Sequence, residues 1–309
     1  MNGDRKPGVR AAICCGLAWI ALADTALADS DDGSWQAEVG VGVTHHDNFF
    51  FRRESATTPA PSATLTRAYA SGEREFDAGR QDWSLFGSAA ATFVSGVNDA
   101  DSQEFRLGAR TSWGDTRASI ELTYLPNLLY SEEAVGTFYD RSGVALEVRH
   151  AFRDGVWLAV EFEQTRWEFD QLEQGRDADV PEVTATFRFP LGSNAALRLF
   201  GNWAEKDARA PENSWNSIGY GIAAELAPAE RWNLFARVRV RDREYRDAPI
   251  GDNNFGRDDK TVDGLINARV RIGEHWGLSG QIEYRNGDST RPDRNYDATM
   301  LSLSAFLTF

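Results

Sequence analysis

From Trp35 onward, the dominant pattern is the recurrence of apolar side chains at every second position. The segment SWQAEVGVGVTH places Trp35, Val39 and Val43 on one side of an extended chain, and WSLFGSAAATF repeats the pattern from Trp83 onward. A period of two is typical of a β-strand whose two faces meet different surroundings. Eleven further segments of this kind follow before the chain ends, so the sequence predicts an all-β protein.

The connections between these segments alternate between short and long. The short ones lie near 114–116, 153–155, 191–194, 227–231 and 273–275. The longer ones are acidic and rich in Gly, Asn and Pro, and lie near 95–102, 131–141, 169–180, 207–214, 245–259 and 288–295. Tight turns at one end and long loops at the other are typical of barrels that cross the bacterial outer membrane. We therefore expect a closed antiparallel up-and-down transmembrane β-barrel.

The number of strands follows from parity, because both termini of such a barrel face the periplasm. Twelve strands cover Trp83 to Phe309, and the segment at Trp35 needs a returning partner, for which only about Leu65–Glu75 is available. This predicts 14 strands, with 12 strands plus an N-terminal extension as the alternative. A soluble β-sandwich or lipocalin-like barrel also alternates, but it does not explain aromatic residues at the same end of successive strands.

Tryptophan placement supports the predicted orientation. Indole rings prefer the interface between membrane and water. The apolar faces of five strands carry a tryptophan at the expected periplasmic end, namely Trp35, Trp83, Trp113, Trp232 and Trp276. We expect an outer girdle from Trp167, Trp203, Trp215 and several tyrosines.

The N-terminus has the layout of a secretory signal peptide. Arg5, Lys6 and Arg10 precede a short apolar run, and Ala26 and Ala28 form an A-x-A cleavage site. This predicts a signal peptide at 1–28 and an outer-membrane barrel at 29–309, exported to the outer membrane of a Gram-negative cell. Both cysteines lie within the signal, so the mature chain is expected to have no thiol.

Residues between the lipid-facing positions are expected to face the lumen, and many are charged. A basic stripe is predicted from Arg237, Arg239, Arg241, Arg269 and Arg271, with Glu161 and Glu163 elsewhere on the wall. Mixed charge is expected from Arg106, Arg110, Glu121, Glu147, Arg149, Arg188, Arg198, Glu283 and Arg285. These side chains either pair across neighbouring strands or line a permeation path that favours anions or sugars.

Composition and histidine spacing exclude several functions. The formal net charge of −14 argues against a nucleic-acid partner. His45, His46, His150 and His275 have no zinc-type spacing, and the acidic loops, which contain Asp99, Asp101, Asp252, Asp258 and Asp259, lack the ligand spacing of an EF-hand. We expect no catalytic residues, metal or cofactor, although His45 or His46 with a loop serine is a possible seed for an outer-membrane hydrolase.

Two segments resemble known families. The final strand MLSLSAFLTF, with Leu303, Leu307 and Phe309 in step, resembles the C-terminal signature of bacterial outer-membrane proteins, which implies recognition by the barrel-assembly machinery. The segment EVGVGVTHHDNFFFRR, through Asp47, Asn48, Phe49 and Arg52, resembles the opening strand of barrels associated with surface-polysaccharide or lipoprotein export.

The expected function is a porin-like or transport-associated passage for small hydrophilic solutes, anions or saccharides among them, in contact with outer-membrane lipid and lipopolysaccharide. A non-conducting barrel that supports surface export or adhesion is one alternative, and an outer-membrane hydrolase is another.

Overall fold

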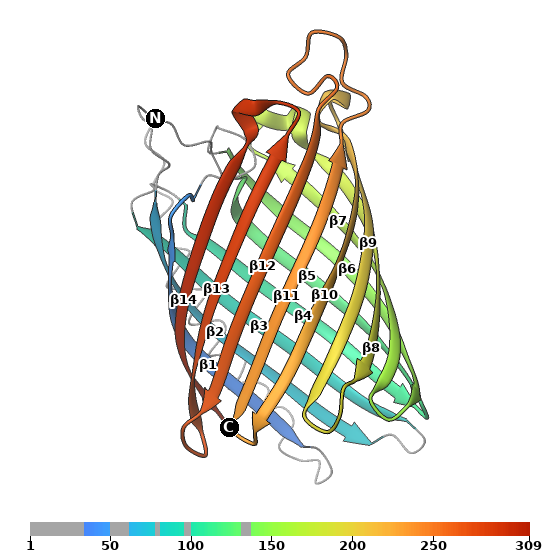
Figure 1. Cartoon of the computed structure of the whole chain (residues 1–309), viewed down its shortest axis with the longest axis vertical. Coiled ribbons are helices and arrows are strands. Elements are labelled where there is room, and N and C mark those ends of the chain that lie inside the picture. Colours follow the sequence, from blue (N-terminus) through green and yellow to red (C-terminus); the bar gives the residue numbers. More distant parts are fainter. Residues whose placement is uncertain (1–33, 50–61, 78–80, 96–99, 131–136) are drawn as a thin grey trace.

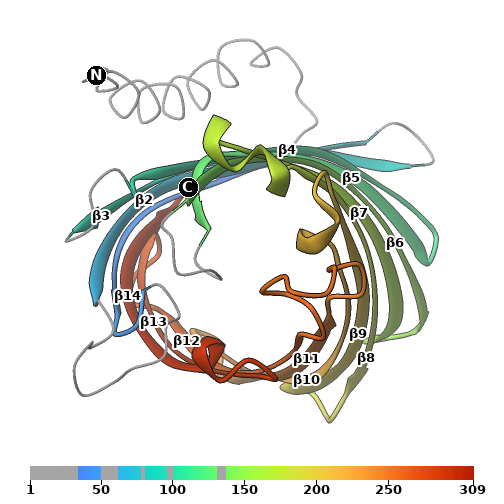
Figure 2. The ribbon, with the colours of Figure 1, turned by 90° about the horizontal axis from the view of Figure 1, so that it is seen from above.

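The computed structural model describes residues 34–49, 62–77, 81–95, 100–130 and 137–309. Within these ranges fourteen strands close into one barrel (Figure 1, Figure 2). In chain order they are β1 (Trp35–His46), β2 (Ala63–Asp77), β3 (Asp82–Ser95), β4 (Ser102–Trp113), β5 (Thr116–Tyr130), β6 (Thr137–Arg153), β7 (Val156–Phe169), β8 (Ala178–Pro190), β9 (Ala195–Ala208), β10 (Trp215–Ala229), β11 (Trp232–Glu244), β12 (Asp258–Arg271), β13 (Trp276–Ser289) and β14 (Tyr296–Thr308). The predicted signal peptide lies outside the described residues, as do Arg52 and Asp99.

Every strand pairs antiparallel with its neighbours in sequence, and β1 closes the barrel against β14. The weakly patterned segment before Trp83 is indeed the returning strand, since β2 pairs with β1 from Trp35↔Arg74 to His46↔Ala63. The prediction of 14 strands is confirmed. The alternatives of 12 strands, of two open sheets and of a lipocalin-like barrel, which has eight strands, are wrong.

The two ends of the barrel differ as the connection lengths predict (Figure 1). One end carries tight turns, in which Gly114 (φ +55°) and Gly155 (φ +75°) adopt the left-handed conformation that favours glycine. The other end carries the long connections, including three short 3₁₀ helices, η1 (Gln171–Arg176), η2 (Pro211–Asn213) and η3 (Pro292–Arg294). No helix of the described residues is long and apolar enough to cross a bilayer. The strands have 12 to 17 residues, longer than expected, because they continue beyond the apolar belt toward the loops.

The outer face of the barrel is an apolar belt. On β11 it runs from Trp232 through Val238 to Val240, and the next outward residue is Asp242. Nine residues of a strand tilted by about 40° rise about 23 Å, close to the roughly 25 Å band of outer-membrane barrels. Four of the five tryptophans predicted at the turn end are exposed on this face, namely Trp35, Trp113, Trp232 and Trp276, and Trp83 is partly exposed.

Aromatic rings on the inner face lie against glycines of the neighbouring strand. Across the closure, Gly277, Phe306, Gly40 and Tyr69 form one row on β13, β14, β1 and β2. A Cβ atom added to Gly40 would lie 2.5 Å from the Tyr69 ring, so no larger residue fits without a shift of the ring. The rings therefore lie along the wall rather than across the lumen, which leaves room inside the barrel.

Candidate functional site

The inner face of the barrel is the candidate functional site, because the charged strand residues gather there. On one side, Glu104 of β4 accepts hydrogen bonds from Arg67 of β2 at 2.9 Å and from Arg106 at 2.6 Å. Arg106 also reaches Glu121 of β5 at 3.1 Å. These side chains form one ion-paired network that joins β2, β4 and β5 across the intervening β3.

Three arginines of the predicted basic stripe, Arg237, Arg239 and Arg241, follow one another on the inner face of β11. Asp263 of β12 lies opposite Arg239 and is only 1% exposed. One of its oxygens accepts from Arg237 at 2.8 Å and the other from Arg239 at 2.7 Å. A carboxylate shared by two guanidinium groups forms strong charge-assisted hydrogen bonds, so this part of the stripe is partly compensated.

The other two arginines of the stripe lie near the turn end of β12. Arg269 forms an ion pair with Glu38 of β1, and its guanidinium lies 3.7 Å from the centre of the Phe306 ring. Glu38 also accepts a hydrogen bond of 2.8 Å from Tyr69. Arg271 donates a hydrogen bond of 3.4 Å to the backbone oxygen of Glu230. Arg269 thus connects β12 to β1 across the intervening strands at the barrel closure.

The two predicted glutamates have different surroundings. Glu163 of β7 accepts from Arg141 of β6 at 2.7 Å, and Glu182 lies opposite it on β8. Glu161 lies directly opposite Glu147 of β6. In the part of the chain that the structure describes, neither Glu161 nor Glu147 forms an ion pair.

A pair of directly opposed arginines on the inner face was not predicted from the sequence. Arg117 of β5 lies directly opposite Arg149 of β6, on the inner face near the turn end. The Arg149 guanidinium lies 5.4 Å from the ring centre of Trp157 on β7. Alternation alone predicts that Arg149 faces the lumen. That Arg117 faces Arg149 follows only from the register between β5 and β6.

Several lumenal arginines are accessible to water at different heights. Their side-chain exposures are 51% for Arg67 and 45% for Arg106 on the loop side, and 38% for Arg198 near the turn end. Charged side chains packed into a closed core would be buried. The interior of the barrel therefore admits water along its wall.

Aromatic side chains also gather inside the barrel at the loop end. Trp167 and Trp215 belong to an inward cluster with Tyr245, and the buried Lys206 ammonium lies 5.2 Å from the Trp167 ring centre. The expectation that Trp167 and Trp215 form an outer girdle is therefore wrong, because both share the inward parity of their strands. Trp203 is exposed on the outer face.

The connections at the loop end are held to one another by hydrogen bonds. They link the connections of β7–β8, β9–β10, β11–β12 and β13–β14 through Arg209→Gln174 (3.4 Å), Asn254→Glu212 O (2.9 Å) and Arg291→Asn253 (3.2 Å). Figure 2 shows these segments along one side of the barrel mouth. This part of the entrance is thus a connected rim.

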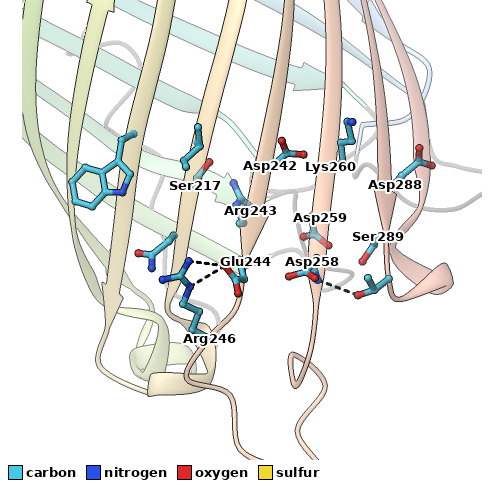
Figure 3. Close-up of a pocket in the computed structure, with 14 residues that line it drawn as sticks. Ser217, Asp242, Arg243, Glu244, Arg246, Asp258, Asp259, Lys260, Asp288 and Ser289 are labelled. Carbon is cyan, nitrogen blue, oxygen red and sulfur yellow. Dashed lines mark hydrogen bonds and ion pairs between the residues drawn. The ribbon is translucent and has the colours of Figure 1, made fainter.

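A hollow of about 640 Å³ lies beside the loop ends of β9 to β13 (Figure 3). Trp203 and Ile218 line it, together with the charged residues Asp242, Lys260 and Asp288. The same hollow contains an exposed pair in which Arg246 donates to Glu244 at 2.7 Å. This hydrogen bond raises the pKa of Arg246. Apolar and charged side chains meet here because the apolar belt ends at this level.

The histidines do not form a common site. His45 is exposed on the outer face opposite Leu301, whereas His46 is buried inside with its ring edge against Phe49. His150 contacts Thr116 at 3.0 Å on the outer face, and His275 lies at a turn, 3.2 Å from Thr308 O. Adjacent residues of a strand point to opposite faces, so His45 and His46 lie on opposite sides of the barrel wall.

Three of the acidic loop residues are engaged within the fold. Asp252 accepts a backbone hydrogen bond from Asn254 at 2.6 Å, and Asp259 binds Arg257 at 2.6 Å. Asp101 accepts from the backbone of Val94 at 2.9 Å. Among the residues that the structure describes, no group of three or more metal-ligating side chains comes together.

The described residues that carry the two family resemblances lie at the barrel closure. Asp47 accepts a hydrogen bond of 2.6 Å from the backbone of Thr299, and Asn48 donates one of 2.8 Å to Asp297 O. At the opposite end, Phe309 donates a backbone hydrogen bond of 2.9 Å to Ala37. The C-terminal residues Leu303, Leu307 and Phe309 are exposed on the outer face.

No protein-family model matches this chain, and no curated protein matches its sequence. Its structure is similar to that of the outer membrane channel DcaP of Acinetobacter baumannii, with 9% sequence identity, a TM-score of 0.54 and coverage of 90% of this chain and 97% of that one. It is also similar to a loop L8 deletion mutant of OmpT, an outer membrane protein of Vibrio cholerae, with 11% identity, a TM-score of 0.50 and coverage of 90% and 100%. At such identities the likeness concerns the fold alone: the chain has the closed β-barrel fold of these bacterial outer-membrane proteins.

Proposed function

We propose that this protein is a porin-like channel of the outer membrane that passes small hydrophilic solutes. The observation that carries the proposal is the water-accessible charge inside the barrel, at Arg67, Arg106 and Arg198. Ion-paired strands give a charged wall with a low net charge, which suits polar solutes. Aromatic rings that lie against inner glycines of the neighbouring strand obstruct the lumen less than rings that project into it.

The same proposal places the barrel in a bilayer. The apolar belt contacts lipid, and the charged residues beyond it, such as Asp242 and Lys260, lie at the level of lipid and lipopolysaccharide head groups. The C-terminal strand, through Leu303, Leu307 and Phe309, is the segment proposed to bind the barrel-assembly machinery. Export through the predicted signal peptide precedes this step.

Conductance in planar bilayers tests the channel function. Purified protein is expected to give steady current steps in potassium chloride, and heat-denatured protein from the same preparation is the control. Swelling of proteoliposomes in small sugars should show the same passage for uncharged solutes. Stable insertion without current or swelling would overturn the proposal and favour a non-conducting barrel.

A further inference from the structure

Two pairs of like charges lie side by side on the inner wall. The arginine pair consists of Arg117 of β5 and Arg149 of β6, and the glutamate pair consists of Glu147 of β6 and Glu161 of β7. Glu147 precedes Arg149 by two residues, so their backbone positions lie about 7 Å apart on one face of β6. Like charges directly opposite each other on neighbouring strands are destabilising. Each pair is therefore unfavourable when nothing else is bound.

The two pairs do not neutralise each other. Within the described residues, none of the four side chains forms an ion pair. Arg149 is instead stacked over the ring of Trp157, on the turn side of β7 and away from Glu147. The Nε atom of Arg117 is buried without a hydrogen-bond partner.

Most neighbouring charges are already engaged. Of the carboxylates around the arginine pair, Glu121 of β5 and Glu73 of β2 bind Arg106 and Arg110, and Glu75 of β2 accepts a hydrogen bond from Ser34. The cation nearest to the glutamate pair on the loop side, Arg141, binds Glu163. Other charged residues of the wall therefore neutralise the charge of either pair only to a limited extent.

Solutes in the lumen can reach this part of the wall. Arg117 lines a hollow of about 460 Å³ at the turn end, together with Glu73, Glu75 and Arg110. Arg149, Glu147 and Glu161 are partly exposed. A ligand at these pairs would therefore exchange with the proposed passage.

We propose that the arginine pair and the glutamate pair together form a subsite for a small zwitterion whose anionic and cationic groups lie about 7 Å apart. This inference deepens the proposed function, because the subsite lies on the wall of the proposed passage. A simple anion at the arginine pair would be repelled by the nearby glutamate pair. A simple cation at the glutamate pair would be repelled by the nearby arginine pair. An extended dipeptide fits both, since two residues span about 7 Å. A single amino acid holds its two charges too close together.

Calorimetric titration of the intact, detergent-solubilised barrel with Ala-Ala tests the subsite. Ala-Ala is expected to bind, whereas N-acetyl-Ala-Ala, Ala-Ala amide and alanine should bind at least about tenfold more weakly. The double variants Arg117→Gln/Arg149→Gln and Glu147→Gln/Glu161→Gln should each weaken Ala-Ala binding about tenfold. The matched control, Arg166→Gln/Glu168→Gln, removes the same kinds of charge from the outer face of β7 and should leave binding unchanged.

Equal binding of the capped peptides, or no binding of Ala-Ala, would overturn the subsite. The ligand series on the unaltered protein decides this point even if a variant does not fold, and heat-modifiable migration on gels reports folding. If Ala-Ala binds but the protein gives no current in bilayers, the subsite stands and the proposed passage is overturned. If the protein gives a current that Ala-Ala neither blocks nor alters, and Ala-Ala does not bind, the proposed passage stands and the subsite is overturned.

Discussion

The two sides of the lumen wall use arginine in opposite ways. On β11 and β12, Arg237 and Arg239 share the buried carboxylate of Asp263, so dense positive charge is compensated locally. On β5 and β6, Arg117 and Arg149 face each other without a carboxylate between them. The wall with more arginines is therefore the better neutralised one. Strand register, rather than the number of charged residues, decides where a solute meets unpaired charge.

The largest expected effect comes from removing the shared carboxylate. Asp263→Asn leaves two guanidinium groups without their partner, and because these groups are about one quarter exposed, we expect a loss of about 2–3 kcal/mol in the free energy of unfolding. Ion selectivity should shift toward anions. Urea unfolding in lipid vesicles and reversal potentials measure the two effects. Glu244→Gln, which alters an exposed pair, should change neither.

A smaller effect separates single arginines on the two walls. Arg239→Gln removes one of the two hydrogen bonds to Asp263 and should lower the free energy of unfolding by about 1.5 kcal/mol. Arg149→Gln loses a stacking contact but relieves repulsion by Arg117, so we expect a change within about 0.5 kcal/mol. The same urea titrations compare the variants. Equal losses at both positions would contradict the difference between the walls.

The smallest effect has the opposite sign. Glu161→Gln removes repulsion between directly opposed carboxylates and should raise the free energy of unfolding by about 0.5 kcal/mol. Glu163→Gln, on the same face of β7, breaks the pair with Arg141 and should lower it. Destabilisation by Glu161→Gln would show that this carboxylate has a stabilising partner.

Alternation and loop length were sufficient to predict the barrel. Because the number of strands must be even, the sequence also predicted the position of the returning strand β2, although its residues are weakly patterned. The inward direction of Arg237, Arg239 and Arg241 follows from the same period of two. These features are predictable because one side chain in two must face lipid.

The partners of the lumenal charges were not predictable. Asp263 lies opposite Arg239, and Arg117 opposite Arg149, only because of the register that hairpin turns and bulges set. Trp167 and Trp215 were assigned by their height on the strand, although their parity places them inside with Lys206. The period of two in the sequence predicts which face of its strand a residue occupies. The neighbour of that residue on the same face depends on pairings between segments that are distant in the sequence.

The pairing of β1 with β14 has a consequence for biogenesis. Ala37 and Phe309 exchange backbone hydrogen bonds, so the first strand gains its second neighbour only after β14 has been synthesised. Until then the sheet has two open edges, each able to template pairing with another chain. Loss of β14 would leave both edges permanently unsatisfied, which makes an intact β14 a condition for avoiding aggregation.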